Sequence, residues 1–266
     1  MFRDLTVIVI ILAASRVALW CVNQFDRRTA TPELSRKLLH IAMGLILCPL
    51  PWLFDRVGPV YVLSATYIGL LIARRYLAAL DNHVAGVIDG VGRKSVGEFL
   101  FPITVALLFT FAYREPVTYL APMLILTLAD AAAAVIGRRY GMCPYPTPGG
   151  CKSLEGSLAF AITAFASTHL TLLLLGSGGR LESVLIAMVI ALTLTIVEAF
   201  VTGGWDNLVV PIFAFALLKG LSNTSSSSLT FLAAGAMIAV LTLVVVYAAV
   251  PSLSANPNQR SKPIEN

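Results

Sequence analysis

The chain has 266 residues, of which 58% are hydrophobic and only 12% are charged. Its mean hydropathy of +0.84 excludes a soluble globular protein, which could not bury that much apolar surface, and indicates a polytopic membrane protein. The net charge is +5, but the basic residues cluster in short loops between apolar runs, which indicates membrane topology and not nucleic-acid binding.

Nine apolar runs follow one another, at about 5–22, 38–54, 58–72, 97–113, 119–136, 154–175, 182–200, 207–220 and 229–250. They predict an all-α bundle with about nine membrane spans, forming a single domain over residues 1–250. The runs at 58–72 and 207–220 are shorter than the ~20 residues of a full span, so we expect them to be tilted, re-entrant or shielded from lipid. The polar tail at 251–266 is expected to be disordered.

Lysine and arginine are distributed unevenly between the two sets of loops. One set, taken with the tail, holds thirteen of them, the other holds five, and Arg16 lies inside the first run. Basic loops remain on the cytoplasmic side of a membrane. The alternation therefore places the N-terminus outside and the C-terminus in the cytoplasm.

Asp130 is a carboxylate within the fifth apolar run, where charge is costly and is usually retained for function. Small residues follow it, Ala131 to Ala134 and then Gly137, and they allow a neighbouring helix or a ligand to approach the backbone closely. Arg138 lies roughly 12 Å further along the same helix at 1.5 Å per residue. Close packing would explain the alanines but not the carboxylate.

Other polar residues fall at the same predicted membrane face as Asp130. They are His40, Glu98, Lys152 with Ser153 and Glu155, Glu198, and Asp206 with Asn207. Structural explanations exist for several of them taken singly. His40 could be a helix-end histidine, Arg36 and Lys37 could be topology signals that reach to the headgroups, Glu98 could pair with Lys94, and Asp206 with Asn207 could form a turn and cap. Their convergence at one face favours a functional site.

The acidic residues supply the oxygen ligands that magnesium prefers. The candidate metal ligands are Asp130, Glu155, Glu198, Asp206 and Asn207. Magnesium usually takes only one or two protein carboxylates and completes its shell with water and substrate phosphates. One of the acids could therefore serve as a general base instead.

The loop before the sixth run predicts an anion site. Gly149 and Gly150 expose backbone N–H groups, Lys152 adds a positive charge, and Ser153 is a plausible N-cap of the following helix, whose N-terminus attracts anions. The loop is not a Walker A motif, because Cys151 stands where that motif requires glycine and no strand is expected before it.

This inventory suits phosphoryl transfer, which depends on positioning and charge neutralisation. A nucleotide triphosphate would arrive from the cytoplasm, and a lipid with a polar head would reach the site laterally through the bilayer. A carboxylate near the acceptor hydroxyl could take its proton.

At these residues the chain resembles the polyprenol kinase family, which includes phytol kinase, dolichol kinase and the CTP-dependent diacylglycerol kinases. The matching elements are Arg36 to His40, Arg93 to Glu98 with Phe101 and Pro102, Leu128 to Gly137 and on to Gly141, Lys152 to Gly156, and Val197 and Glu198 with Asp206 and Asn207. The Lys152 to Gly156 element is also similar to the Lys-Thr-x-Glu-Gly motif of CDP-diacylglycerol synthases.

The resemblance implies CTP, or alternatively UTP, as phosphate donor, a divalent metal such as Mg²⁺, and a lipid alcohol such as phytol, farnesol, geranylgeraniol or another polyprenol as acceptor. With the residue chemistry it predicts catalytic roles for Asp130, Lys152, Glu155 and His40. The predicted nucleotide and phosphate contacts are Arg36, Lys37, Arg93, Lys94, Gly137, Arg138, Arg139, Gly149, Gly150, Lys152, Ser153 and Gly156.

Two other functions fit parts of the pattern. A cytidylyltransferase would form a CDP-linked lipid and release pyrophosphate. A transporter would also explain charge within the membrane, but it should show inverted repeats and interrupted helices near the midplane. The sequence shows no such repeat, and its charges lie near one face.

Overall fold

The computed structural model describes residues 2–29, 31–80, 96–176 and 178–249. Two residues predicted to contact phosphate, Arg93 and Lys94, lie outside the described residues, as does the tail at 251–266.

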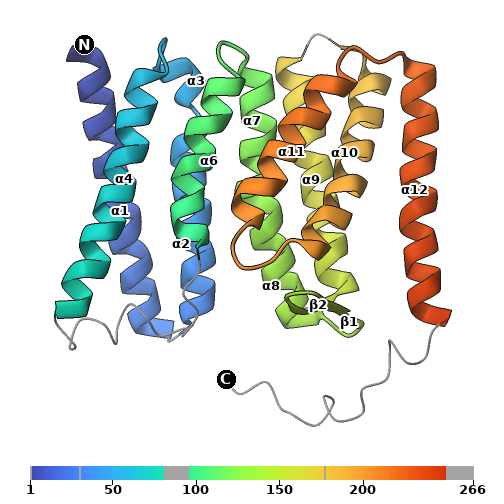
Figure 1. The fold of residues 1–266 in the computed structure, drawn as a ribbon, viewed down its shortest axis with the longest axis horizontal. Helices are drawn as coiled ribbons and strands as arrows, with labels where there is room; N and C mark the ends of the chain where they lie inside the picture. Colours follow the sequence, from blue (N-terminus) through green and yellow to red (C-terminus); the bar gives the residue numbers. More distant parts are fainter. Residues whose placement is uncertain (1, 30, 81–95, 177, 250–266) are drawn as a thin grey trace.

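Almost all of the described chain is helical, and the long helices run roughly along one common direction, with α4, α6 and α11 lying in front of other helices in the view of Figure 1. The predicted all-α bundle is therefore confirmed. The helices are α1 (Phe2–Thr29), α2 (Pro32–Leu47), α3 (Leu50–Leu53), α4 (Gly58–Leu80), α6 (Gly97–Phe111), α7 (Pro116–Leu124), the π-helix η1 (Ile125–Ala129), α8 (Asp130–Tyr140), α9 (Leu154–Leu175), α10 (Arg180–Phe200), α11 (Asp206–Leu221) and α12 (Ser226–Ala249).

Each predicted apolar run falls on one helix or on consecutive helices. Within the described ranges, six segments are long and apolar enough to cross a membrane: Phe2–Thr29, Pro32–Leu53, Pro116–Tyr140, Leu154–Leu175, Arg180–Phe200 and Ser226–Tyr247. Shorter apolar stretches occur at Gly58–Ala73 and Gly97–Phe111. Nine crossings and the orientation of the chain stay predictions.

The helix α11 lies between two hydrophobic clusters. Its residues Val210, Ala214 and Leu218 belong to a cluster formed mainly by α10, with contributions from α7, η1, α9 and α12. On another side, Ile212 and Phe215 pack against a cluster formed by α1 to α7. The short 207–220 run is therefore packed against protein on two sides, while Phe213 on it remains exposed. The explanation of its short length stays a prediction.

A short antiparallel hairpin fills the loop between α8 and α9. Strands β1 (Pro144–Thr147) and β2 (Gly150–Ser153) pair from Pro144 opposite Ser153 to Thr147 opposite Gly150. The expectation that no strand precedes α9 was therefore wrong. Four-residue strands carry too little alternating pattern to be recognised, and Gly150 accommodates the turn with a φ of +134°.

Close contact between α8 and α9 depends on two glycines. A Cβ added to Gly156 would lie 2.9 Å from the carbonyl oxygen of Ala133 and 3.1 Å from the Cα of Gly137. Larger side chains would therefore separate the two helices. The small residues after Asp130 do allow a neighbouring helix to approach, as their pattern predicted.

Candidate functional site

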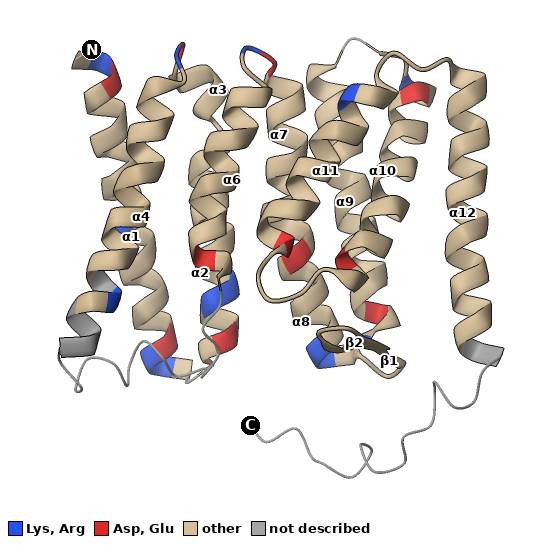
Figure 2. Cartoon of the chain, viewed as in Figure 1, with Lys and Arg blue, Asp and Glu red and all other residues tan. Residues whose placement is uncertain are grey.

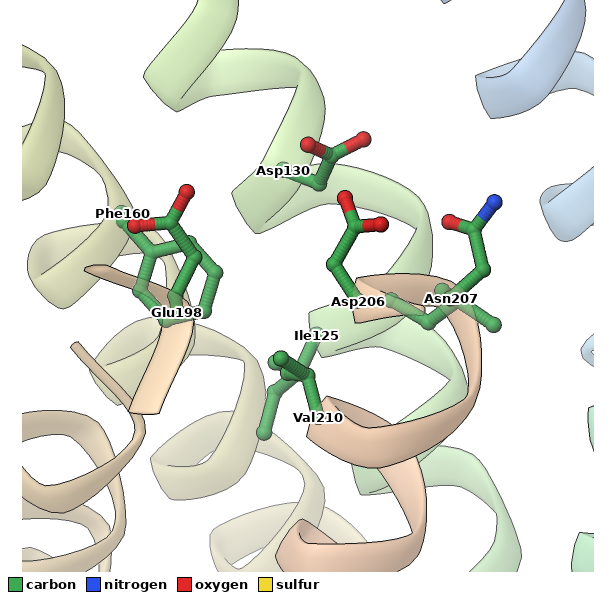
Figure 3. A pocket seen from close by; sticks show the side chains of 8 residues that line it. Ile125, Asp130, Phe160, Glu198, Asp206, Asn207 and Val210 are labelled. Atoms are coloured by element: carbon green, nitrogen blue, oxygen red, sulfur yellow. The ribbon is translucent and has the colours of Figure 1, made fainter. Parts of the chain in front are cut away.

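Four polar side chains from three helices converge on one small pocket (Figure 3). Asp130 comes from α8, Glu198 from α10, and Asp206 and Asn207 from the first turn of α11. The other lining residues are Ile125, Leu126, Phe160 and Val210. The cavity has a volume of about 10 Å³, close to the space that a single water or a similarly small ion occupies.

Lys37 of α2 forms an ion pair with Asp130. Its Nζ donates to Asp130 Oδ2 over 2.6 Å, and the lysine side chain is only 7% exposed. A charge at such a buried position requires a partner. Lys37 was predicted to contact phosphate, and the structure places it beside the pocket instead of on the outer surface.

Lys152 of β2 forms a second ion pair, with Glu198. Its Nζ lies 2.6 Å from Glu198 Oε1 and also donates to the Glu198 backbone carbonyl. These contacts link the hairpin to the C-terminal end of α10. This contact brings together two residues that the sequence had placed at the same face from different segments.

Asp206 differs from the other two acids of the pocket. Its Oδ1 is buried and has no hydrogen-bond donor among the described residues. An unsatisfied buried acceptor costs about 1–3 kcal/mol, and such groups tend to mark functional positions. The neighbouring Asn207 amide is engaged, because Nδ2 donates to the carbonyl of Gly97 at 3.0 Å.

The donor set fits a magnesium ion that is bound jointly with substrate. In the described part of the chain, no three acidic, histidine or cysteine residues form a ready metal cage. Magnesium needs only one or two carboxylates when water and phosphate oxygens complete its shell. The unpaired oxygen of Asp206 and the carboxylate of Asp130 line the same pocket, and together they offer the one or two carboxylates that magnesium requires.

His40 lies next to the pocket but does not line it. Its Nε2 is 2.8 Å from the carbonyl oxygen of Leu126, and its ring meets the Phe101 ring edge-on at 5.1 Å between centroids. Leu126 belongs to the π-helix η1, which immediately precedes Asp130. Single π-turns of this kind occur frequently at functional sites.

Glu33 joins two of the predicted phosphate ligands. Its Oε1 accepts from Arg36 Nη2 at 2.8 Å and lies 2.9 Å from Arg138 Nη2. Sequence reasoning missed Glu33, because an acid three residues before Arg36 looks like an ordinary helix-surface pair. The link to Arg138 on α8 cannot be read from that spacing. Arg139 instead lies over the Tyr140 ring, at 5.6 Å from its centroid.

The remaining predicted residues lie mainly in the hairpin and the start of α9. Ser153 Oγ accepts from Gly156 N at 3.1 Å, so the predicted N-cap is confirmed. Glu155 accepts from the backbone N–H of Cys143 at 3.1 Å and does not line the pocket. Gly149 packs against Thr202, where an added Cβ would come within 2.3 Å. Roles for these residues in metal or phosphate binding stay predictions.

Tyr145 lies on strand β1 of the hairpin. Its hydroxyl is 2.6 Å from Ser157 Oγ, and its ring meets the Tyr247 ring of α12 edge-on. Burial raises the pKa of the Tyr145 phenol. The hairpin is thus in contact with α9, α10 and α12.

The acids and basic groups described above lie toward the end of the bundle where α2 begins and α8 ends, and both of these helix ends carry basic residues (Figure 2). Sequence comparison finds that the chain is similar to a known enzyme. The chain is 27% identical over 191 residues to phytol kinase from Synechocystis sp., covering 70% of this chain and 79% of that protein. This similarity supports a relationship to the polyprenol and phytol kinases. No family model matches it, and no solved structure does. The relationship and the six apolar segments together indicate a membrane protein.

Proposed function

We propose that the protein is a kinase that transfers the γ-phosphoryl group of CTP to the hydroxyl of a membrane lipid alcohol, at the cytoplasmic face. Phytol, farnesol, geranylgeraniol and other polyprenols are the acceptors considered. The observation that carries the proposal is the convergence of Asp130, Glu198 and Asp206 on one pocket, with Lys37 and Lys152 paired to two of them. Similarity to a phytol kinase supports the reaction class.

The basic groups around the pocket suit a triphosphate. Arg36 and Arg138 are more than half exposed, at 53% and 63%, and share the carboxylate of Glu33. Guanidinium groups bind phosphate oxygens in pairs of hydrogen bonds. The pocket is too small to enclose a nucleotide, so the triphosphate would lie over it, between these arginines and Lys152.

Asp130 and Asp206 would hold Mg²⁺, with Glu198 and Asn207 adjacent. The ion would supply charge neutralisation on the donor phosphates. Asp130 is held in place by Lys37, and Glu198 by Lys152. These pairs fix the acids in position before substrate arrives.

The transfer itself makes one bond and breaks one. The acceptor oxygen bonds to the γ-phosphorus, the bond from that phosphorus to the β-phosphate oxygen breaks, and CDP leaves. A carboxylate of the pocket accepts the hydroxyl proton. The products are CDP and a phosphorylated alcohol.

Product analysis with CTP labelled at either end tests the reaction. We expect label from the γ-phosphate to appear in the lipid when the purified protein is given geranylgeraniol and magnesium, and ATP to be a poorer donor. Incorporation of the α-label, with release of pyrophosphate, would instead identify a cytidylyltransferase. Use of ATP alone would contradict the link to CTP.

Cysteine labelling tests the proposed orientation. Cys143 and Cys151 are both exposed in the hairpin region. In intact cells a membrane-impermeant maleimide should leave them unlabelled, and permeabilised cells should show labelling at both. A variant with both residues replaced by serine is the control, and labelling from outside would reverse the topology.

A further inference from the structure

A larger hollow lies between α6 and α11. Its volume is about 340 Å³, and it is lined by Leu107, Phe111, Leu208, Val209, Ile212 and Phe213. Every one of these side chains is a hydrocarbon. The volume falls in the range of about 300–1,000 Å³ that is usual for ligand pockets. We call these six residues the α6–α11 groove.

The groove and the polar pocket are lined by consecutive residues of α11. Leu208 and Val209 directly follow Asp206 and Asn207 on α11. At this junction Asn207 Nδ2 donates to the Gly97 carbonyl, and Thr104 of α6 donates to the backbone carbonyl of Asn207 at 2.7 Å. The helices α6 and α11 therefore carry both the polar groups that lie near the acids and the apolar side chains that line the groove.

The groove opens onto the outer surface of the helix bundle. Phe111 is 51% exposed and Phe213 is 41% exposed, although α6 and α11 otherwise pack against each other and against the protein core. In a bilayer such a surface is reached by lateral diffusion, without passage of the ligand through water. The volume of about 340 Å³ favours one hydrocarbon chain over the two chains of a diacylglycerol.

We infer that the α6–α11 groove binds the hydrocarbon chain of a single-chain isoprenoid alcohol, with the hydroxyl directed toward Asn207 and the acids. The inference rests on the proposed function and specifies its acceptor site. Methyl branches of the isoprenoid would pack against Phe111 and Phe213 at one end, and the hydroxyl would lie at the junction formed by Asn207 and Thr104.

Photolabelling tests binding without relying on activity. The full-length protein in nanodiscs would be irradiated with a diazirine analogue of geranylgeraniol, and the modified peptides mapped by mass spectrometry. We expect labelling of residues 103–111 and 208–213 that excess geranylgeraniol suppresses and excess phosphatidylcholine does not. Labelling spread over α1 and α12 without such competition would mean ordinary contact with bilayer lipid and would overturn the inference.

A substitution that fills the groove with a larger side chain tests lipid binding kinetically. Val209→Trp should raise the KM for geranylgeraniol by about tenfold, equivalent to roughly 1.4 kcal/mol of binding free energy. The KM for CTP should not change, and neither should turnover of a five-carbon alcohol too short to occupy the groove. Leu170→Trp is the matched control, because Leu170 is 51% exposed on α9 and does not line the groove.

The possible outcomes separate the groove from the proposed function. An unchanged KM for geranylgeraniol in Val209→Trp, with normal phosphorylation, would exclude the groove and leave the kinase in place. Absence of phosphoryl transfer by the unmodified protein would contradict the proposed kinase activity. Photolabelling with and without competing geranylgeraniol would then test lipid binding in the groove independently of activity.

Discussion

Lys37 donates a hydrogen bond to Asp130 over 2.6 Å, between two residues that lie 93 positions apart in the chain. The contact joins α2 to the first residue of α8, and both side chains are largely shielded from solvent. Neither charge could remain at this depth alone without a large desolvation cost. The pair therefore fixes the position of the carboxylate that the pocket presents.

Removal of one member of this pair should destabilise the protein. Lys37→Met leaves the Asp130 carboxylate buried and unpaired, which we expect to cost roughly 3–5 kcal/mol. The double variant Lys37→Met with Asp130→Asn should recover most of that stability and still lack kinase activity. Unfolding in detergent, followed by circular dichroism, measures the first effect. Equal stability of the single and double variants would show that the pair carries no charge coupling.

Asp206→Asn should separate stability from activity. The unmodified carboxylate is a buried group beside Asp130 and Glu198 with one oxygen lacking a donor, so replacement by a neutral amide removes a buried negative charge and should raise the melting temperature in the absence of ligand, by an amount equivalent to about 1–3 kcal/mol. The same variant should lose catalysis and lose the stabilisation that magnesium with CTP gives the unmodified protein. A melting temperature that still rises fully with magnesium and CTP would exclude Asp206 as a ligand.

Glu33 should act as a positioning residue for nucleotide binding. Its carboxylate holds Arg36 and Arg138 on one oxygen, at 2.8 and 2.9 Å. Glu33→Gln should raise the KM for CTP several-fold while kcat stays nearly unchanged, since it loosens both guanidinium groups without touching the pocket acids. Glu33→Asp should restore part of the affinity. A fall in kcat at constant KM would contradict a role in binding.

Gly44 should be needed for the contact between α2 and the π-helix. A Cβ at this position would lie 2.1 Å from Oγ1 and 2.7 Å from Cβ of Thr127, so rotation of the threonine side chain cannot relieve the clash. Gly44→Ala should shift α2 and lower both stability and activity. Gly69→Ala is the control, because Gly69 has nothing within 4 Å of an added Cβ, and helix propensity then favours alanine by about 1 kcal/mol. Equal effects of the two substitutions would exclude the tight contact.

The helical fold could be predicted from the long apolar runs, because each run is longer than a typical β-strand. The hairpin was not predictable in the same way. Its strands have four residues each, and its pairing depends on Gly150 and on packing of Gly149 against Thr202. Such contacts depend on tertiary structure, which the local pattern does not contain.

The candidate site could be predicted only in part, because the sequence pattern shows which face a residue lies on but not which residue it contacts. Alternating basic loops placed Asp130, Glu198 and Asp206 at one face, and the structure brings these three together. The partners of the acids could not be predicted, because Lys37 and Lys152 reach them across long sequence separations. Glu155 looked equivalent to the other acids in sequence, yet its side chain turns to the backbone of Cys143.

The most direct test of the account is the transfer of labelled γ-phosphate from CTP to geranylgeraniol by the purified protein, by Lys152→Ala and by the control Lys219→Ala. Lys219 pairs with Glu115 and does not line the pocket. We predict transfer by the unmodified protein and by Lys219→Ala, and at least a hundredfold loss, or about 2.7 kcal/mol, in Lys152→Ala. Full activity of Lys152→Ala, or no transfer by the unmodified protein, would contradict the account.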